Sequence, residues 1–143
     1  MIDGNFAVAQ SGGPTAAINA TLCGVIECAF SCGKKIYGSR NGILGVINDN
    51  LTELNPIFAD MNNLQLLKTT PAAYLGSCRY KLPEANCNSE VYETIFDNFE
   101  KHNIRMFIYI GGNDSMDTVS KLSQYSIQHN KGVSVVGVPK TID

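Results

Sequence analysis

The sequence predicts an α/β protein in which a mostly parallel sheet lies between two layers of helices. Short apolar runs typical of strands alternate along the chain with longer segments of helical periodicity. One run, 104–110, is apolar almost throughout, as expected of a parallel strand that is buried on both faces. The runs at 6–10, 104–110 and 133–138 each lead into a glycine-rich or polar loop, which is typical of strand–helix units.

Local signals place the individual elements. A helix follows the strand at 6–10, because Pro14 suits a first helical position and Gly33 supplies a stop. A second helix covers 89–101, with Ser89 as its cap and apolar residues on one face. The remaining expectations are strands at 35–38 and 51–54, one helical turn within 39–50, mostly loop over 55–88, a helix from the turn at 111–115 to about residue 125, and a final strand at 133–138.

Composition is that of an ordinary single-domain globular protein. The chain has 143 residues, of which 44% are hydrophobic and 17% charged, and a net charge of −2. This argues against disorder, fibres and coiled coils, and gives no general attraction to nucleic acid or anionic lipid. No apolar run is long enough to span a bilayer and the N-terminus lacks a signal-peptide pattern. We therefore expect a soluble, cytoplasmic protein that binds neither nucleic acid nor membrane.

The five cysteines do not suggest a disulfide scaffold or a zinc site. Their number is odd, no signal peptide accompanies them, and no CxxC pair is present. We expect Cys23 and Cys28 to act as small buried hydrophobic residues. Cys78 lies beside Arg79, whose charge would favour the thiolate, so a reactive thiol is the alternative to an inert one there.

Three predicted strands end in loops suited to phosphate, at 11–15, 111–115 and 139–143. In a parallel sheet these loops share the carboxyl edge, where ligands bind. Glycine lets the backbone approach a phosphate, and a following helix presents free N–H groups. The alternative for each loop is a tight strand–helix turn. The spacing fits neither the dinucleotide fingerprint nor the Walker loop, which disfavours the common nucleotide folds.

Charged residues accompany these loops. Arg79 follows a Gly-Ser turn, and its guanidinium suits phosphate oxygens, although a surface arginine is usually just solvated. Asp114 and Asp143 lie in strand-end loops, where carboxylates bind Mg²⁺ or act as a base. The alternatives are a helix cap for Asp114 and a solvated loop residue for Asp143.

Together, five strings resemble the phosphofructokinase family, in the family's order and spacing and over essentially all 143 residues: Gln10 to Asn19, Gly38 to Gly45, Leu75 to Arg79, Gly111 to Ser115 and Pro139 to Asp143. The resemblance implies a three-layer αβα fold in which residues 1–143 form a single, partial donor-binding domain that is incomplete at its C-terminus. It also implies phosphoryl transfer to the 1-hydroxyl of fructose 6-phosphate, giving fructose 1,6-bisphosphate in glycolysis, with Mg²⁺.

The resemblance further implies roles for individual residues. Thr141 and Asp143 match the family's T-x-D, in which the aspartate takes the proton of the sugar hydroxyl, and Lys140 joins them as a catalytic residue. Asp114 is the expected metal ligand, together with Asn113, where many members carry an aspartate that would bind Mg²⁺ better. The residues expected at the donor phosphates are Gly12, Gly13, Arg79, Gly111, Gly112, Asp114 and Ser115.

Two positions bear on the phosphoryl donor. ATP-using members of the family typically have glycine at the positions of Asp114 and Lys140, whereas pyrophosphate-using members resemble this chain. An aspartate fills, and charges negatively, space that the α-phosphate of ATP would occupy, and Lys140 can neutralise a compact donor or leaving phosphate. A unit charge pair at about 4 Å contributes on the order of 4 kcal/mol near a protein surface. We expect a pyrophosphate donor, with ATP as the alternative.

Family members are more than twice as long as this chain, which ends at the expected base. We therefore expect the isolated chain to be a truncated part that is not a competent kinase, and the full-length protein to be a homo-oligomer. A phosphate-binding module without turnover and a non-functional remnant are alternatives of another class. A sugar-binding half continuing in frame past Asp143 would favour the enzyme.

Overall fold

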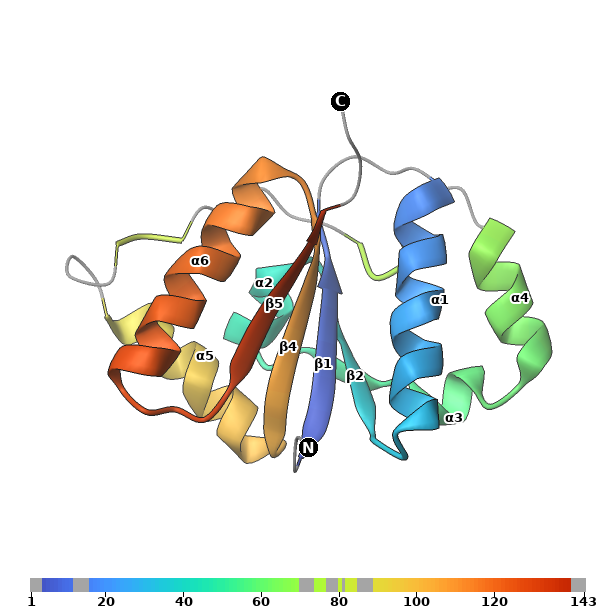
Figure 1. Ribbon diagram of the computed structural model, residues 1–143, viewed down its shortest axis with the longest axis horizontal. Coiled ribbons are helices and arrows are strands. Elements are labelled where there is room, and N and C mark those ends of the chain that lie inside the picture. Colours follow the sequence, from blue (N-terminus) through green and yellow to red (C-terminus); the bar gives the residue numbers. More distant parts are fainter. Residues whose placement is uncertain are drawn as a thin grey trace.

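The computed structural model describes residues 4–11, 16–69, 74–76, 80, 82–84 and 89–139. Its five strands form one sheet in the order β3-β2-β1-β4-β5 (Figure 1). Neighbouring strands pair in parallel except β3, which is antiparallel to β2, so the expected mostly parallel sheet is confirmed. The strands are β1 (Asn5–Gln10), β2 (Ile36–Ser39), β3 (Leu51–Glu53), β4 (Ile104–Gly111) and β5 (Ser134–Pro139).

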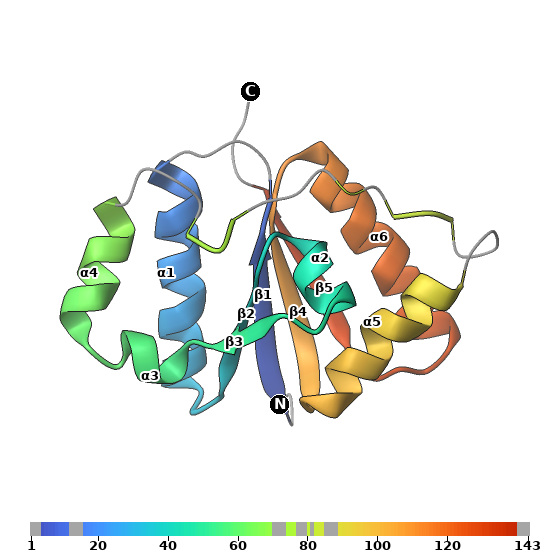
Figure 2. The same cartoon turned by 180° about the vertical axis from the view of Figure 1, so that it is seen from behind.

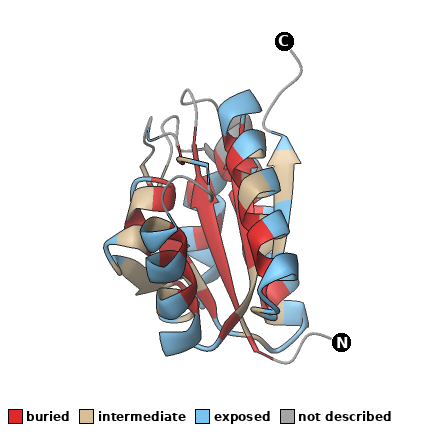
Figure 3. Cartoon of the chain, turned by 90° about the vertical axis from the view of Figure 1, so that its left-hand side faces the viewer, coloured by how far each residue is buried: buried red, intermediate tan, exposed pale blue. Residues whose placement is uncertain are grey.

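Helices cover both faces of the sheet and complete the three layers (Figures 1 and 2). One layer holds α1 (Ala16–Ser31), α3 (Asn55–Phe58) and α4 (Met61–Thr69). The opposite layer holds α2 (Ile43–Ile47), α5 (Glu90–Lys101) and α6 (Asn113–Gln128). Buried residues line the central strands and the sheet-facing sides of the helices, so a separate apolar core lies on each side of the sheet (Figure 3).

The chain reverses its direction of travel across the sheet between β1 and β4. From β1 the chain crosses through α1 to β2, and from β4 it crosses through α6 to β5, in the opposite direction. Since such crossovers are right-handed, helices that run in opposite directions across the sheet must lie on opposite faces. The boundary between β1 and β4 is therefore a topological switch point, the usual place for a ligand in an open α/β sheet.

The segments with a strong apolar repeat form the helix and the strand that the sequence predicts. The helix expected at 89–101 is α5, and it buries Tyr92, Ile95, Phe96 and Phe99, one face of a helix with the spacing i, i+3, i+4, i+7. Phe99 packs on Phe107 of β4 with ring centroids 5.3 Å apart. The apolar run at 104–110 forms the buried strand β4, as expected.

The expectation of mostly loop over 55–88 is wrong for its first part, which forms α3 and α4. Proline at 56 lies in the first turn of α3, where its missing N–H breaks no hydrogen bond. In α4, Leu64 and Leu67 are buried, but Met61 and Leu66 on the same short helix are exposed. The apolar residues therefore do not keep to one face, which hides the helix from a periodicity argument.

Smaller details also differ from the sequence expectations. Gly33, at φ 68°, follows α1 and is the expected stop. Ser89 occupies the N-cap position of α5, but its side chain makes no capping hydrogen bond, so its predicted capping role is wrong. Cys23 is buried as expected, whereas Cys28 is exposed. Cys78 lies outside the described residues. Within the described part of the chain, no helix is both long and apolar enough to cross a membrane.

Candidate functional site at the carboxyl edge of the sheet

The ends of β1, β4 and β5 meet at the switch point. The Ser11 N–H donates to the Ile110 carbonyl at 2.8 Å, which extends the pairing of β1 with β4 by one residue. On the other side of β4, Gly111 pairs with Pro139, the last residue of β5. The three strand-end loops that the sequence singles out therefore start from neighbouring strands. Of the predicted site residues in these loops, Gly12, Gly13, Lys140, Thr141 and Asp143 lie outside the described residues, as does Arg79.

Gly111 and Ser115 hold the end of β4 close to α6. A Cβ atom on Gly111 would lie 2.7 Å from the Cβ of Ser115 and 3.0 Å from the carbonyl oxygen of Ser11. Real Cβ contacts are essentially never this short, so only glycine fits at 111 without movement of β1 or α6. The Ser115 side chain is buried. Gly111 and Ser115 therefore determine how closely β4, α6 and the end of β1 approach one another at the switch point.

The next residues face outward. Gly112, Asn113 and Asp114 are exposed and form the N-cap and the first turn of α6. Gly112 has an extended backbone, and a Cβ placed on it would meet no atom of the described residues within 4 Å. Gly112, as the N-cap residue, has no side chain with which to cap this helix. The first N–H groups of a helix lack intrahelical partners and carry the positive end of its dipole, so this turn offers an anion an open approach.

Asp114 and Asn113 present oxygen ligands at the same turn. Gly112 is the N-cap, so Asp114 is not the helix cap that was its alternative role. No ion pair among the described residues includes Asp114. Nor do the described residues contain a cluster of three or more His, Cys, Asp or Glu that could hold a metal. One carboxylate and one amide suit a Mg²⁺ ion whose other ligands are phosphate oxygens and water.

Two buried amides lie directly behind this edge, and no sequence argument assigned them a role. Gln10, the last residue of β1, and Asn19 of α1 are both fully buried. The Gln10 Nε2 donates to the Asn19 Oδ1 at 2.9 Å. Asn19 belongs to the core face of α1 with Leu22, Cys23 and Ile26. A polar residue at a helical position that belongs to the buried apolar face needs hydrogen-bond partners in the core, and this signal could have identified Asn19 from the sequence.

The segment Tyr74–Gly76 is attached to these amides. The Leu75 N–H donates to Gln10 Oε1 at 2.8 Å, and the Tyr74 N–H donates to Asn19 Oδ1 at 3.0 Å. The Leu75 carbonyl accepts from the Asn41 N–H at 2.8 Å. Leu75 also lies so close to Gly38 that a Cβ there would be 2.7 Å from Leu75 Cδ2. The segment is thereby fixed against β1, α1 and the end of β2.

Arg40 adds a positive charge near this segment. Its guanidinium lies over the Tyr74 ring, 5.5 Å from the ring centroid, and its Nη1 is 3.4 Å from the Tyr74 carbonyl oxygen. Arg40 is half-buried and takes part in no ion pair among the described residues. It lies within the string Gly38 to Gly45 but was not singled out there, because one arginine in a polar loop carries no distinctive spacing.

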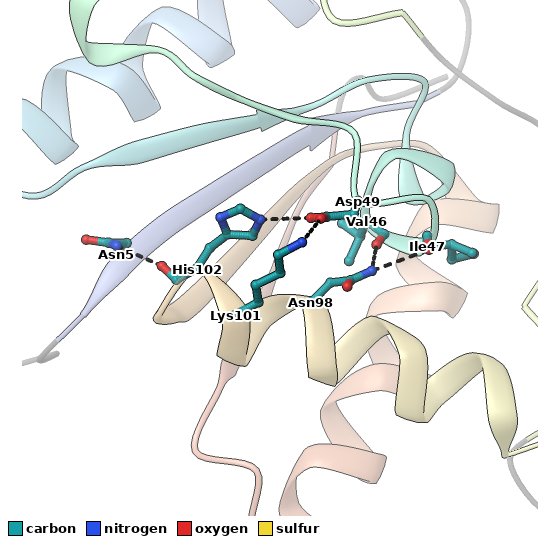
Figure 4. A network of polar contacts seen from close by, with 7 residues as sticks. All are labelled: Asn5, Val46, Ile47, Asp49, Asn98, Lys101 and His102. Carbon is teal, nitrogen blue, oxygen red and sulfur yellow. Dashed lines mark hydrogen bonds and ion pairs between the residues drawn. The ribbon is translucent and has the colours of Figure 1, made fainter.

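A second polar network joins α2 to α5 (Figure 4). Asp49 accepts a hydrogen bond from Lys101 at 2.5 Å and lies 2.8 Å from His102 Nε2. Hydrogen bonds from Lys101 and then His102 hold the pKa of the Asp49 carboxyl below its ordinary value, outweighing its desolvation. Asn98 donates to the Val46 carbonyl at 2.6 Å. His102 lies two residues before the start of β4, at the opposite end of that strand from Gly111, so this network supports the fold.

Comparisons with known proteins agree with this geometry. The family model for phosphofructokinase matches residues 5–143. The pyrophosphate–fructose 6-phosphate 1-phosphotransferase of Xanthomonas campestris pv. campestris is 42% identical over 143 residues, covering 100% of this chain and 34% of that protein. An ATP-dependent 6-phosphofructokinase of Vibrio campbellii is 32% identical over 136 residues, covering 95% of this chain and 38% of that protein.

A solved structure supports the same relationship. The crystal structure of pyrophosphate-dependent phosphofructokinase from Nitrosospira multiformis matches with a TM-score of 0.87 and 41% identity, covering 98% of this chain and 34% of that one. The chain thus spans about a third of the length of the pyrophosphate-dependent relatives that it matches. Since the family model covers nearly every residue and the fold agrees, this chain belongs to the phosphofructokinase family.

Proposed function

We propose that this chain is the donor-binding domain of an enzyme that transfers a phosphoryl group from pyrophosphate to the 1-hydroxyl of fructose 6-phosphate. The product is fructose 1,6-bisphosphate. The observation that carries the proposal is the exposed turn Gly112–Asp114, which lies at the switch point and begins α6, with no described residue within 4 Å of a Cβ placed on Gly112. A compact anion can reach the helix N–H groups there. A homo-oligomeric, cytoplasmic enzyme is part of the same proposal, on the strength of the family resemblance.

Asp114 supports the choice of pyrophosphate over ATP. It is exposed in the first turn of α6, where ATP-using family members typically have glycine. A carboxylate there repels a further phosphate and fills its space, while pyrophosphate ends short of it. The more similar relative carries a pyrophosphate-dependent name, and the relative with the ATP-dependent name is less similar, which favours the same donor.

The proposed roles of the site residues follow from the resemblance, and for Gly111, Gly112, Asp114 and Ser115 they also draw on the geometry described above. Phosphoryl transfer depends mainly on positioning and on charge neutralisation. When bound, Mg²⁺ would neutralise phosphate charge beside Asp114 and Asn113. Asp143 would take the proton of the sugar hydroxyl, with Thr141 and Lys140 beside it. The donor phosphates would lie against Gly12, Gly13, Arg79 and Gly112, with Gly111 and Ser115 shaping the site from behind.

Calorimetric titration of the chain tests the proposal, once circular dichroism shows it folded. We expect Mg-pyrophosphate to bind more tightly than Mg-ATP, and the double variant Asp114→Gly, Lys140→Gly to shift the preference toward ATP. Asp117→Gly is the matched control, because Asp117 is exposed one turn further along α6 and pairs with Lys121 at 2.9 Å. Tighter binding of ATP by the wild-type chain, no binding of either donor, or an unchanged preference in the double variant would contradict the proposal.

A further inference from the structure

We propose that Gln10 and Asn19, hereafter the amide pair, are positioning residues for the phosphoryl donor. They fix the end of β1, the start of α1 and the segment Tyr74–Gly76 relative to one another. This inference rests on the proposed function, because the chain segments that the pair holds are the ones that lead to Gly12, Gly13 and Arg79. Neither amide is proposed to touch the donor.

The amide pair joins the chain on the two sides of the first glycine loop. Gln10 is the last residue of β1, and Asn19 lies in α1, so their mutual hydrogen bond at 2.9 Å joins the two ends of the chain segment 11–18. Both side chains are fully buried. A buried hydrogen bond of this kind is shielded from competition by water and stays formed. The span between the end of the strand and the first turns of the helix is thereby set by two side chains.

The same pair satisfies two successive backbone N–H groups of the other segment. Leu75 donates to Gln10 Oε1 at 2.8 Å, and Tyr74 donates to Asn19 Oδ1 at 3.0 Å. A backbone N–H needs an oxygen acceptor, so these two donors determine which way both amides point. Gln10 Nε2 must then face Asn19, as observed. The four groups therefore form one mutually consistent network.

The amide pair supplies hydrogen-bond acceptors that apolar residues could not supply. The surrounding core is apolar, with Val8, Leu22 and Leu75 all fully or almost fully buried in it. Replacing a buried polar pair by apolar residues of the same shape is often neutral for stability, provided that no partner is left unpaired. Here the partners are backbone groups of a segment that belongs to no strand or helix. What the amides add is a directional attachment of that segment to the end of β1.

The test compares Gln10→Met with Asn55→Leu in the 143-residue chain. Gln10→Met keeps the length of the side chain and removes its hydrogen bonds to Asn19 and Leu75. Asn55 is the matched control, since its amide also makes two hydrogen bonds with backbone, accepting from Ile36 N at 2.8 Å and donating to Lys34 O at 3.1 Å. Those contacts lie at the start of β2, away from the carboxyl edge.

Two readouts separate a positioning role from a structural one. Hydrogen exchange of the Tyr74 and Leu75 amides, measured relative to global unfolding, should become faster in Gln10→Met and stay unchanged in Asn55→Leu. The dissociation constant of Mg-pyrophosphate, measured by calorimetry well below the unfolding temperature, should rise at least about tenfold in Gln10→Met, as expected for lost hydrogen bonds in a buried network. It should change less than about twofold in the control. If Gln10→Met does not fold, Asn19→Ser removes the acceptor for Tyr74 and serves the same comparison.

The outcomes distinguish this inference from the proposed function. Equal losses of affinity in Gln10→Met and Asn55→Leu, or no loss in Gln10→Met, contradict the inference while leaving the donor assignment intact. A folded wild-type chain that binds no Mg-pyrophosphate contradicts the proposed function, and with it the positioning of a donor by the amide pair, even where exchange at Leu75 still depends on Gln10.

Discussion

The two adjacent glycines at the end of β4 should lose stability to different extents when each is replaced by alanine. In Gly111→Ala the new methyl group meets Ser115 Cβ at 2.7 Å and the Ser11 carbonyl at 3.0 Å, about 1 Å inside ordinary contact. Relief requires β4, β1 or α6 to move within packed cores, so we expect a loss of about 1–3 kcal/mol in the free energy of unfolding. In Gly112→Ala the methyl group meets no described residue within 4 Å, and the extended backbone accepts alanine.

The stability of Gly112→Ala should therefore fall by less than about 1 kcal/mol, the cost of alanine at an N-cap. Its methyl group does occupy the space that we assign to the donor, so its affinity for Mg-pyrophosphate should fall. Urea unfolding followed by circular dichroism measures the difference, because a loss of about 2 kcal/mol shifts the midpoint by roughly 1 M for a protein of this size. Equal destabilisation by both substitutions, or normal pyrophosphate affinity in Gly112→Ala, would refute the reasoning.

Two further predictions concern ionisable groups. The folded pKa of Asp49 is depressed, so its contribution to stability is present above the unfolded pKa of about 4 and is lost as pH falls through the folded value. In Asp49→Asn, the free energy of unfolding should fall less steeply below about pH 4 than in the wild type. Asp97→Asn, a change at an exposed residue of α5, should not have this effect. Equal slopes below about pH 4 in the wild type and both variants would contradict this prediction. Burial raises the pKa of the Cys23 thiol, and Cys28 and Cys32 are exposed, so iodoacetamide should label the latter two in the folded chain and Cys23 only after unfolding. Mass spectrometry measures the outcome, and rapid labelling of Cys23 in the folded chain would show that this thiol is not buried between α1 and α4.

Sequence periodicity predicted the parts of the fold that bury a regular face. The strand β4 and the helix α5 were predicted within one residue of their ends, because their apolar residues follow the repeat of a buried strand and of an amphipathic helix. In α4, exposed Leu66 is next to buried Leu67, so the repeat is broken and the helix was not predicted. The antiparallel direction of β3 was also not predicted, since it depends on how three residues pair with β2.

The candidate site was predicted to a different depth at each position. The motif predicted that Gly111, Gly112 and Asp114 belong to the site at the end of β4. The sequence could not show that packing requires glycine at 111, whereas a Cβ at 112 would meet no described residue within 4 Å. That distinction depends on where Ser115 and Ser11 lie. The amide pair was not predicted because its partners are backbone groups some 55 and 65 residues away, and backbone groups leave no trace in residue type.

The switch point has a consequence for how the chain folds. Strands β1 and β4, which make the centre of the sheet, pair residues 100 positions apart, such as Ala7 with Phe107. By contrast, β1 joins β2, and β4 joins β5, through a single intervening helix. Closing a long loop is entropically costly and slows folding, so each βαβ unit should form before the two units dock. During synthesis, β1 therefore cannot pair with its central neighbour until residues 104–111 have left the ribosome.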